Sequence, residues 1–266
     1  MLEILRANPA PGRLRFAVFD FDGTLSLLRM GWQKVMDDFM VETLQATPRA
    51  EAEAQLRTRT AEPVFEMAGR PTVVQMQWLV DEVRQRGGTP LTAKAYKHQY
   101  LVRLSERIRH RADLEAGHLQ PERFRVTGAL EFVAALHARG VTCYIASGTG
   151  ETAVREEVAL LGLAPLIADL RGAREDGADA KRVVIDFLIA NHHLSTGEVA
   201  MIGDGPAEIE YARAARGLAI GVASTEDERA GIDTRKRSLL IAAGADIIIP
   251  DFSQPAGLLA YLWPTE

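Results

Sequence analysis

Short, almost continuously apolar stretches occur near the start of the chain and through its second half. They are rich in β-branched and aromatic residues, and several end abruptly at Asp, Ser or Gly. Apolar runs of this length are typical of parallel strands that are buried on both faces. We therefore predict strands at residues 14–19, 141–146, 199–202, 218–222 and 247–249.

Segments with apolar residues at helical spacing lie between these stretches in the second half of the chain. They predict helices at residues 129–139, 151–161, 181–191, 207–216 and 235–243. Strand and helix thus alternate over residues 126–263, which is the pattern of repeated right-handed βαβ units. The predicted fold class is α/β, with a Rossmann-like parallel sheet as its core.

Residues 27–125 show a second pattern, in which apolar residues follow helical spacing and no strand-like run appears. Helix-breaking residues divide this stretch at Pro48, Pro63, residues 69–71 and residues 87–90. We predict that residues 27–125 form an inserted all-helical domain, and that residues 1–26 and 126–266 form the core.

Composition and charge restrict the classes of function. The chain has 266 residues, of which 47% are hydrophobic and 25% charged, the balance of a soluble globular protein. Its net charge of −5 argues against general nucleic-acid binding, because affinity for a phosphate backbone needs a concentrated basic face. A small anionic substrate stays compatible with this charge, since a pocket needs only a few local cations.

The single cysteine, Cys143, allows no intramolecular disulfide, so a reducing cytoplasm is the expected location. It lies in the apolar run at residues 141–146, and we expect it to be buried. Residues 1–15 have scattered charges and lack the apolar core of a signal peptide. No apolar run approaches the roughly 18–20 residues of a membrane span, so we expect a soluble cytoplasmic protein without a membrane partner.

The first predicted strand ends in Asp20, Phe21, Asp22, Gly23 and Thr24. Ligands of doubly wound sheets bind outside the carboxyl ends of the strands, which makes these residues candidates for chemistry. Two carboxylates this close repel each other unless a cation or shared proton relieves them, and Mg²⁺ prefers oxygen ligands. Thr24 is placed to hydrogen-bond near Asp22. The alternative is a polar turn in which an aspartate caps the local backbone.

A second acidic motif follows the strand predicted at residues 199–202. It consists of Gly203, Asp204 and Gly205, with Glu208 four residues after Asp204. A carboxylate at this strand end can complete an oxygen-rich metal site, with Glu208 one helical turn away. The alternative is that Asp204 caps the next helix and Glu208 interacts favourably with the helix dipole.

Two further sites carry groups that suit an anion. Ser147, Gly148 and Thr149 follow the strand at residues 141–146, and we predict that they stand at a helix N-terminus, where a hydroxyl and free N–H groups form an anion cradle. Lys181 is predicted in the first turn of a helix, where a cation opposes the dipole, which indicates an anion nearby. The alternatives are a serine N-cap and a solvated surface lysine.

These motifs arrive in the order Asp-x-Asp-Gly-Thr, Ser, Lys and Gly-Asp-(x)₃-Glu. In this order the chain resembles the haloacid dehalogenase-like hydrolase superfamily over essentially its whole length. The resemblance is to the phosphatase and phosphoglucomutase-like branch with a helical cap of the first type. It implies that residues 27–125 are the cap.

The resemblance also implies a role for each motif residue. Asp20 is expected to be the nucleophile that becomes an aspartyl-phosphate. Asp22 is expected to protonate the leaving alcohol and then to act as the base for water. Ser147, Gly148 and Lys181 are expected to hold the phosphoryl oxygens.

The same resemblance implies a Mg²⁺ site made by Asp20, Asp204 and the backbone carbonyl of Asp22. Glu208 stands where the family usually has Asp, so a water-mediated contact with the metal is expected rather than direct ligation. An aspartate at position 22 also favours phosphate monoesters as substrates. Dehalogenases of the superfamily lack an aspartate at this place, and phosphonate-cleaving members typically lack it as well.

Arg70, in the Gly69-Arg70-Pro71 turn of the predicted cap, is the candidate for substrate specificity. It presents a five-donor fork on a stiff turn and resembles short cap-loop motifs of phosphoglucomutase-like members. The alternative is an exposed loop arginine without a substrate contact. The arginines at positions 103, 107, 109 and 111 are predicted to form a solvated helix face.

The predicted function is a Mg²⁺-dependent phosphatase that acts on a small phosphorylated metabolite. Sugar phosphates come first, followed by phosphoglycolate and nucleotide monophosphates. One alternative is a phosphomutase that returns the phosphoryl group to the sugar. The other is a non-catalytic binding or regulatory protein that kept the fold. The sequence does not predict the oligomeric state.

Overall fold

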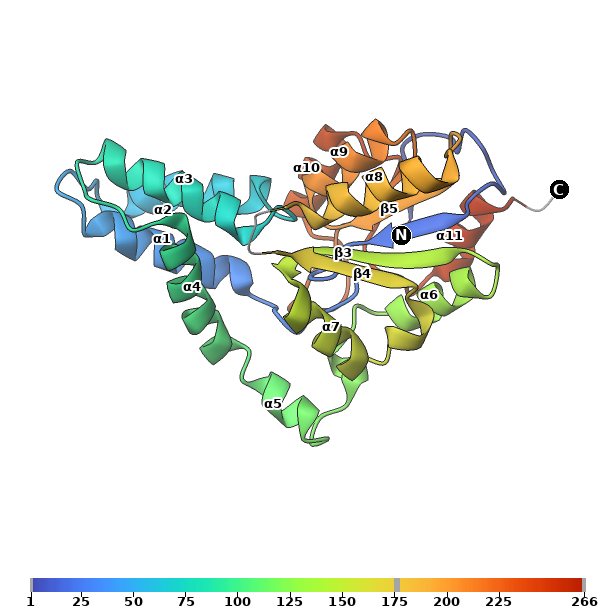
Figure 1. Cartoon of the computed structure of the whole chain (residues 1–266), viewed down its shortest axis with the longest axis horizontal. Helices are drawn as coiled ribbons and strands as arrows, with labels where there is room; N and C mark the ends of the chain where they lie inside the picture. The colour runs from blue at the N-terminus through green and yellow to red at the C-terminus, as the bar shows by residue number, and fades with distance from the viewer. Residues whose placement is uncertain (1, 175–177, 265–266) are drawn as a thin grey trace.

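A computed structural model describes residues 2–174 and 178–264 of the chain (Figure 1). Within these residues the sheet has seven strands in the order β1-β7-β6-β5-β2-β3-β4. Every pairing is parallel except that of β1 with β7. The strands are β1 (Glu3–Ile4), β2 (Phe16–Phe19), β3 (Thr142–Gly150), β4 (Asp169–Ala173), β5 (Val199–Gly203), β6 (Leu218–Val222) and β7 (Ile247–Ile249). The predicted α/β class is confirmed.

Five of these strands, β2, β3, β5, β6 and β7, occupy the predicted apolar runs. The edge strand β4 was not predicted, because half-exposed Asp169 and Arg171 interrupt its apolar residues. An edge strand needs no continuous apolar run, since one of its sides has no strand neighbour. The two-residue strand β1 is too short to leave a pattern.

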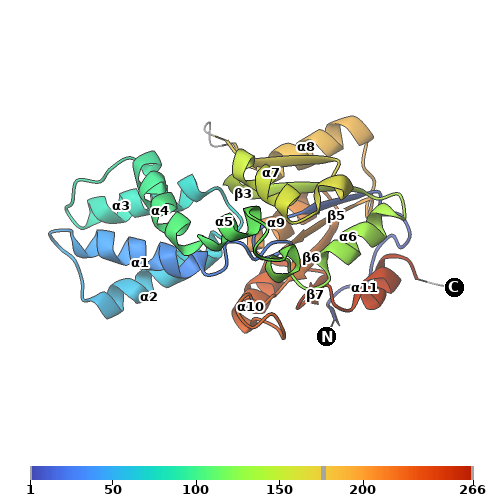
Figure 2. The ribbon, with the colours of Figure 1, turned by 90° about the horizontal axis from the view of Figure 1, so that it is seen from below.

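Helices cover both faces of the sheet (Figures 1 and 2). Ala17 and Phe19 of β2 belong to the hydrophobic cluster under one set of helices, and Phe16 and Val18 to the cluster under the other, as expected for a strand whose side chains alternate. The first set is α6 (Ala129–His137), α7 (Glu151–Leu160) and α11 (Pro255–Leu262). The second is α8 (Ala180–His192), α9 (Pro206–Ala214) and α10 (Thr234–Ala243).

The segment between β2 and β3 is helical and forms a lobe beside the sheet (Figures 1 and 2). Four of its helices share a hydrophobic cluster of their own, which includes Phe39, Leu56, Leu79 and Tyr96. The helices are α1 (Trp32–Gln45), α2 (Glu53–Glu66), α3 (Thr72–Gln85), α4 (Ala93–Arg107) and α5 (His110–Glu115), followed by the 3₁₀ turn η1 (Pro121–Phe124); a second 3₁₀ turn, η2 (Ala164–Leu166), precedes β4.

A β-bridge between Ser26 and Arg125 brings the two ends of this helical segment side by side. The segment therefore leaves and rejoins the core at one place, next to the end of β2. None of the described helices combines the length and the apolarity that a membrane crossing requires.

Candidate active site

The register of the sheet aligns three of the predicted motifs. Phe19, the last residue of β2, pairs with Ile145 of β3 on one side and Ile202 of β5 on the other. The residues that follow these positions, among them Asp20 and Asp204, therefore emerge at the same edge of the sheet. The backbone N–H of Asp20 donates to the Ile202 carbonyl at 2.8 Å, which fixes the start of this motif.

Lys181 reaches this edge from the first turn of α8. Its Nζ lies 3.0 Å from Asp20 Oδ1 and 2.6 Å from Glu208 Oε1, and it donates to the Gly69 carbonyl. The side chain is buried, with 1% of its surface exposed. Burial alone would lower the pKa of Lys181, but the two carboxylates outweigh it and raise that pKa. The position of Lys181 in the first turn of a helix predicted an anion nearby, and the carboxylates of Asp20 and Glu208 are such anions.

Asp20 is buried as well, and this burial raises its pKa to about 7 against the attraction of Lys181. Glu208 serves two functions at the same edge. Its Oε2 accepts the N–H of Gly205 at 3.0 Å, which caps the start of α9, while its Oε1 faces Lys181. The alternative in which Asp204 caps this helix is therefore wrong, because the N-cap is Gly205 and the capping side chain is that of Glu208.

Asp22 is held by side chains from two other segments. Thr149 Oγ1 donates to Asp22 Oδ2 at 2.7 Å, and Arg29 Nε lies 3.5 Å from Asp22 Oδ1. Burial is the main cause that raises the pKa of Asp22. The hydroxyl of Thr24 has no hydrogen-bond partner within the part of the chain that the structure describes. Thr149, rather than the predicted Thr24, therefore holds Asp22.

Arg29 links this edge of the sheet to α7 through a buried carboxylate. Its Nη2 lies 2.6 Å from Glu157 Oε1, and Arg111 Nη1 approaches the same oxygen at 3.1 Å. Complete burial raises the pKa of Glu157 to about 7 despite these two cations. The solvated face predicted for the arginine run is wrong for Arg111, which closes this ion-pair chain.

Asp204 has a buried lysine of its own, which the sequence analysis missed. Lys236 Nζ lies 2.8 Å from Asp204 Oδ2 and 2.8 Å from Glu226 Oε1. Burial raises the pKa of Asp204 to about 6, and the ammonium of Lys236 opposes that rise. Lys236 lies in the first turn of α10, so the argument that singled out Lys181 would have found it too.

Ser147 lies inside β3 rather than at a helix N-terminus, because β3 continues to Gly150 and α7 begins at Glu151. The predicted contribution of a helix terminus is therefore wrong for this residue. Its Oγ accepts the N–H of Thr149 at 3.1 Å, and the register of β3 against β4 shifts just beyond Ala146. Ser147 still lines the space in front of Asp20.

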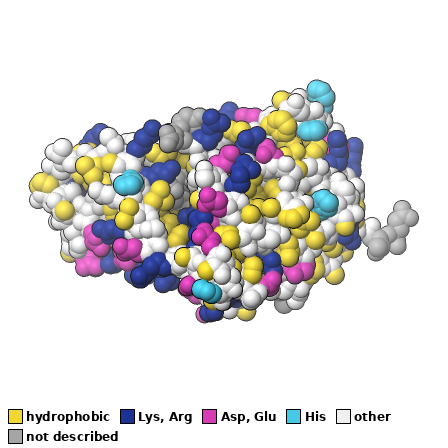
Figure 3. Space-filling model, turned by 60° about the horizontal axis from the view of Figure 1, so that its bottom comes forward, with side chains coloured by type: hydrophobic (Ala, Val, Ile, Leu, Met, Phe, Trp, Pro, Cys, Tyr) yellow, Lys and Arg dark blue, Asp and Glu magenta, His cyan; other side chains and the backbone are white. Residues whose placement is uncertain are grey.

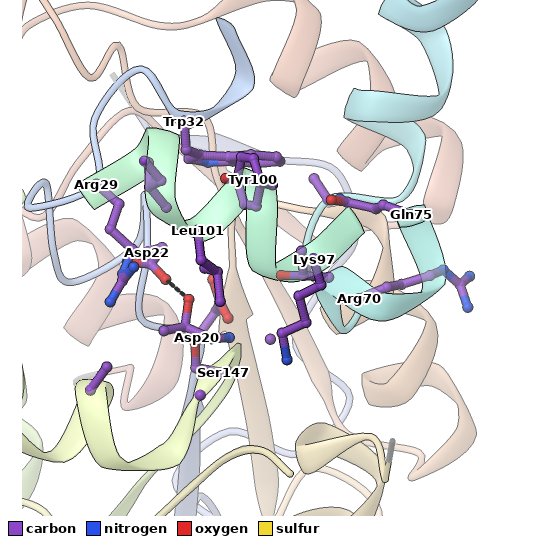
Figure 4. A pocket seen from close by; sticks show the side chains of 18 of the residues that line it. Asp20, Asp22, Arg29, Trp32, Arg70, Gln75, Lys97, Tyr100, Leu101 and Ser147 are labelled. Atoms are coloured by element: carbon purple, nitrogen blue, oxygen red, sulfur yellow. Dashed lines mark hydrogen bonds and ion pairs between the residues drawn. The ribbon is translucent and has the colours of Figure 1, made fainter. Parts of the chain in front are cut away.

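A cavity of about 190 Å³ lies in front of the strand ends (Figure 4). Its floor includes Asp20, Asp22, Ser147 and Asp204, and its roof comes from α1, α3, α4 and the loop between α2 and α3. The backbone of that loop approaches the backbone of the core closely where the core has a glycine. A Cβ on Gly148 would lie 2.7 Å from the Arg70 carbonyl oxygen, so only glycine permits this approach.

The side chain of Arg70 extends away from the floor of the cavity (Figure 4). Its Nη2 lies 2.9 Å from Glu210 Oε2 of α9, and 40% of its side-chain surface is exposed. Its backbone lines the cavity beside Gly148. A contact between Arg70 and a leaving group stays a prediction.

The donor set at this edge fits a hard cation. Asp20 and Asp204 are buried carboxylates with raised pKa values, and Lys236 contacts Oδ2 of Asp204, which leaves its other carboxylate oxygen. Within residues 2–174 and 178–264, no three acidic, histidine or cysteine side chains converge to form a site by themselves. A cation here would need backbone and water oxygens as well, which Mg²⁺ commonly keeps.

Comparison with known proteins decides the family. A family model described as haloacid dehalogenase-like hydrolase matches residues 14–216. The chain belongs to the haloacid dehalogenase-like hydrolase family. The match spans all four motifs, from Asp20 to Glu208, and the family includes phosphatase-like and phosphomutase-like hydrolases. No curated protein matched the chain significantly.

Solved structures share the fold of this hydrolase at low sequence identity. A predicted phosphoglycolate phosphatase from Haemophilus somnus aligns with a TM-score of 0.60 and 17% identity, over 92% of this chain and 98% of that one. A hydrolase from Pseudomonas syringae aligns with a TM-score of 0.58 and 19% identity, over 94% and 99%. A β-phosphoglucomutase-like protein from Bacteroides vulgatus aligns with a TM-score of 0.58 and 13% identity, over 95% and 91%.

Proposed function

We propose that this hydrolase is a Mg²⁺-dependent phosphatase that removes the phosphoryl group of a small metabolite through an aspartyl-phosphate on Asp20. One observation carries the proposal. Asp20 faces the cavity in contact with the buried ammonium of Lys181, at the edge where Asp22 and Asp204 also emerge. A carboxylate nucleophile, a proton donor and a fixed cation are therefore within one small space.

In the proposed reaction, a carboxylate oxygen of Asp20 attacks phosphorus and the bond from phosphorus to the leaving oxygen breaks. Asp22 gives its proton to that oxygen, which leaves as the alcohol. Asp22 then takes a proton from water, whose oxygen attacks phosphorus and releases Asp20 and inorganic phosphate. The hydrogen bond from Thr149 and the nearby Arg29 support this role, because they fix the carboxyl group of Asp22.

Ser147, Gly148 and Lys181 are the proposed phosphate-binding groups. An ammonium has three N–H donors, and those of Lys181 face Asp20, Glu208 and the Gly69 carbonyl. A phosphoryl oxygen can bind Lys181 only by replacing one of these acceptors. The Gly69 carbonyl is the only neutral one, so we expect the α2–α3 loop to move away when substrate binds.

Asp20, Asp204 and the backbone carbonyl of Asp22 would hold Mg²⁺, with Glu208 acting through water. The ion would neutralise charge on the phosphoryl oxygens. Lys236 occupies Asp204 Oδ2, which leaves the other carboxylate oxygen of Asp204 for the metal. The side-chain oxygen Oδ1 of Asp22 lies beside the cation of Arg29, so the backbone carbonyl of Asp22 is its proposed contact with the metal.

Residues 27–125 are the proposed cap, on a core of residues 1–26 and 126–266. The cap supplies the roof of the cavity, so it would exclude water and contact the leaving group. The meeting of Ser26 and Arg125 at one bridge supports a hinge at this place. Phosphorylated sugars are the first substrates to test, and a cytoplasmic location is part of the proposal.

The decisive experiment measures phosphate release from a panel of phosphorylated metabolites, with Mg²⁺ and after its removal by chelation. The proposal expects Mg²⁺-dependent release from at least one small ester. Interconversion of phosphate isomers without release would identify a phosphomutase instead. Failure to act on any ester with Mg²⁺ present would leave a non-catalytic member of the family.

A further inference from the structure

The roof of the cavity has an apolar wall that the proposed catalytic chemistry does not use. Tyr100, Leu101 and Leu104 of α4 line it, and Trp32 at the start of α1 stands beside them (Figure 4). Tyr100 and Leu101 follow Lys97 by three and four residues and precede Leu104 by four and three, so the four side chains lie on one face of α4. This face presents one cation and three large apolar side chains to the cavity.

The charges that line the cavity are divided between its floor and its roof. The lining carboxylates, Asp20, Asp22 and Asp204, all follow strands β2 and β5 of the core. The lining cations, Arg29, Arg70 and Lys97, all come from the helical segment. The leaving group would therefore meet cations and no carboxylate on the roof.

Two of these three cations already have carboxylate partners. Arg29 is paired with Glu157 and Arg70 with Glu210. The ammonium of Lys97 has no carboxylate of the described residues within 4.0 Å and no hydrogen bond to them. Glu151, which lines the groove next to Lys97, accepts instead from Arg155 and from the N–H of Gly172. Among the residues that the structure describes, Lys97 is thus a partly buried cation at the cavity without a carboxylate partner.

We propose that Lys97 determines specificity by binding an anionic group on the leaving alcohol, whose flat or apolar body packs on Trp32, Tyr100, Leu101 and Leu104. This inference rests on the proposed function and narrows its substrate class. The substrate is a phosphate monoester of a small alcohol that carries a second anionic group, such as a carboxylate, on an apolar or aromatic frame.

The polar groups of the roof argue against a neutral, fully hydroxylated leaving group. Recognition of many hydroxyls needs acceptors, and a lysine has none. The side-chain acceptors of the roof are few, namely the hydroxyls of Thr72 and Tyr100 and the Oε1 of Gln75, whose Nε2 donates to the Met67 carbonyl. The large apolar side chains would also leave hydroxyls unpaired, which is costly in a closed site.

The size of the cavity sets a second limit. About 190 Å³ is little more than the engineered apolar cavities of about 150 Å³ that accept a single benzene ring. A phosphoryl group with one ring, or with a short branched chain, fits this range. A nucleoside would require the roof to open further than it does in the arrangement of Figure 4.

The test compares three esters on the full chain with Mg²⁺. Phenyl phosphate has the ring without the anion, 2-phosphoglycolate has the anion without the ring, and 4-carboxyphenyl phosphate has both. We expect kcat/KM for 4-carboxyphenyl phosphate to exceed that for phenyl phosphate by about tenfold to a hundredfold, the range of one charge-assisted contact. We also expect it to exceed the value for 2-phosphoglycolate, which lacks the apolar frame.

The variant Lys97→Met should bring the ratio between the two aryl esters close to one, and Lys97→Arg should keep most of it. The matched control is Lys94→Met, which removes an exposed lysine from the same helix and should keep the ratio of the unmodified chain. A ratio near one in the unmodified chain, or a ratio that Lys97→Met does not change, would overturn the inference.

Binding separates this inference from the proposed function. The affinities of the two aryl esters for Asp20→Asn, measured by calorimetry, should show the same preference and the same loss when Lys97→Met is added. If no ester is hydrolysed but this preference is found, the proposed function fails and the inference stands. If esters are hydrolysed and Asp20→Asn binds both aryl esters equally, the inference fails and the proposed function stands.

Discussion

The floor of the candidate active site consists of charged side chains with almost no contact to solvent. Lys181 and Lys236 are buried, and each ammonium lies within 3.0 Å of two carboxylates. A buried charge is costly unless opposite charges compensate it, so each lysine stabilises the carboxylates that it contacts. This pairing keeps Asp20 and Asp204 at neighbouring strand ends, where the proposed chemistry needs them.

Replacement of Asp20 by Asn tests the proposed nucleophile. We expect Asp20→Asn to reduce phosphate release by several orders of magnitude, as nucleophile deletions do, because an amide cannot form the aspartyl-phosphate. The fold should persist, since Lys181 keeps Glu208 as a partner. Steady-state kinetics and circular dichroism measure the two effects. Turnover like that of the unmodified chain would exclude Asp20 as the nucleophile.

Replacement of Arg29 tests the buried ion pair behind Asp22. Arg29→Met leaves the Glu157 carboxylate buried with Arg111 alone, so we expect a loss near the lower end of the roughly 3–5 kcal/mol typical of broken buried pairs. The folded-state pKa of Glu157 is about 7, above its usual 4.5, so stability falls as pH rises through this window. Arg29 lowers that pKa, so its removal extends the fall to higher pH.

The loss of stability in Arg29→Met should therefore be larger at pH 8 than at pH 6, as measured by urea unfolding. Besides Arg29, Glu157 senses the charges of Asp22 and Arg111, which are kept in all variants. The control is the same substitution in a Glu157→Gln background, where Asp22 is the carboxylate beside Arg29 that still titrates. The pH dependence of the loss should become smaller there. An equal loss at both pH values in the presence of Glu157 would contradict the argument.

The buried partners differ in how well a sequence predicts them. Lys181 could be predicted because a lysine in the first turn of a helix opposes the dipole. Lys236 also lies in the first turn of its helix, α10, but it stands in a short basic run, Arg235-Lys236-Arg237, that obscures this signal. Arg29 and Glu157 are 128 positions apart, and no local pattern connects them. Only the packing of the helical segment against α7 brings them together.

At the scale of the elements, the turn of the α2–α3 loop could be predicted from the sequence, whereas its contacts with the core could not. The predicted Gly-Arg-Pro turn is present, and Gly69 adopts a φ of 81° that favours glycine. The partners of the loop could not be predicted, because they lie across the boundary between two packed parts of the chain. A Cβ on Gly205 would lie 2.8 Å from the Ala68 carbonyl oxygen, so close docking depends on glycine there too.

Arg70 belongs to this loop. Two variants can distinguish its proposed contact with the leaving group from a role in holding the loop against the core. Arg70→Ala should lower kcat/KM for the preferred metabolite relative to phenyl phosphate, by the roughly 1.5–3 kcal/mol of one charge-assisted contact. Glu210→Ala is the matched control, because it breaks the same exposed ion pair, worth less than about 1 kcal/mol, from the core side. Equal effects of both variants on both esters would assign Arg70 to docking alone.

At the scale of the whole molecule, the helical segment and the core meet through polar contacts around the cavity. Gln33 Nε2 donates to Glu226 Oε1 at 3.1 Å, and Arg235 donates to the Ala61 carbonyl at 2.8 Å while lying over the ring of Phe65. Such contacts can be broken and remade with water, which suits a cap that opens. Acidic and basic side chains of the described residues are interspersed on the face in Figure 3, so that face has no large patch of one charge.

The stability of the whole molecule should depend on Mg²⁺. A ligand that binds only the folded state stabilises it by mass action, by about 2.7 kcal/mol at a hundredfold excess over Kd. Here Mg²⁺ would also relieve the repulsion between Asp20 and Asp204, since the charge of Asp20 raises the pKa of Asp204. We therefore expect Mg²⁺ to raise Tm by several degrees, and chelation to reverse the rise and abolish phosphate release.

Asp204→Asn should remove the Tm rise, whereas Asp81→Asn, which changes an exposed aspartate of α3, should keep it. A Tm that does not respond to Mg²⁺ in the unmodified chain, or one that responds equally in Asp204→Asn, would place the metal elsewhere or remove it from the proposal.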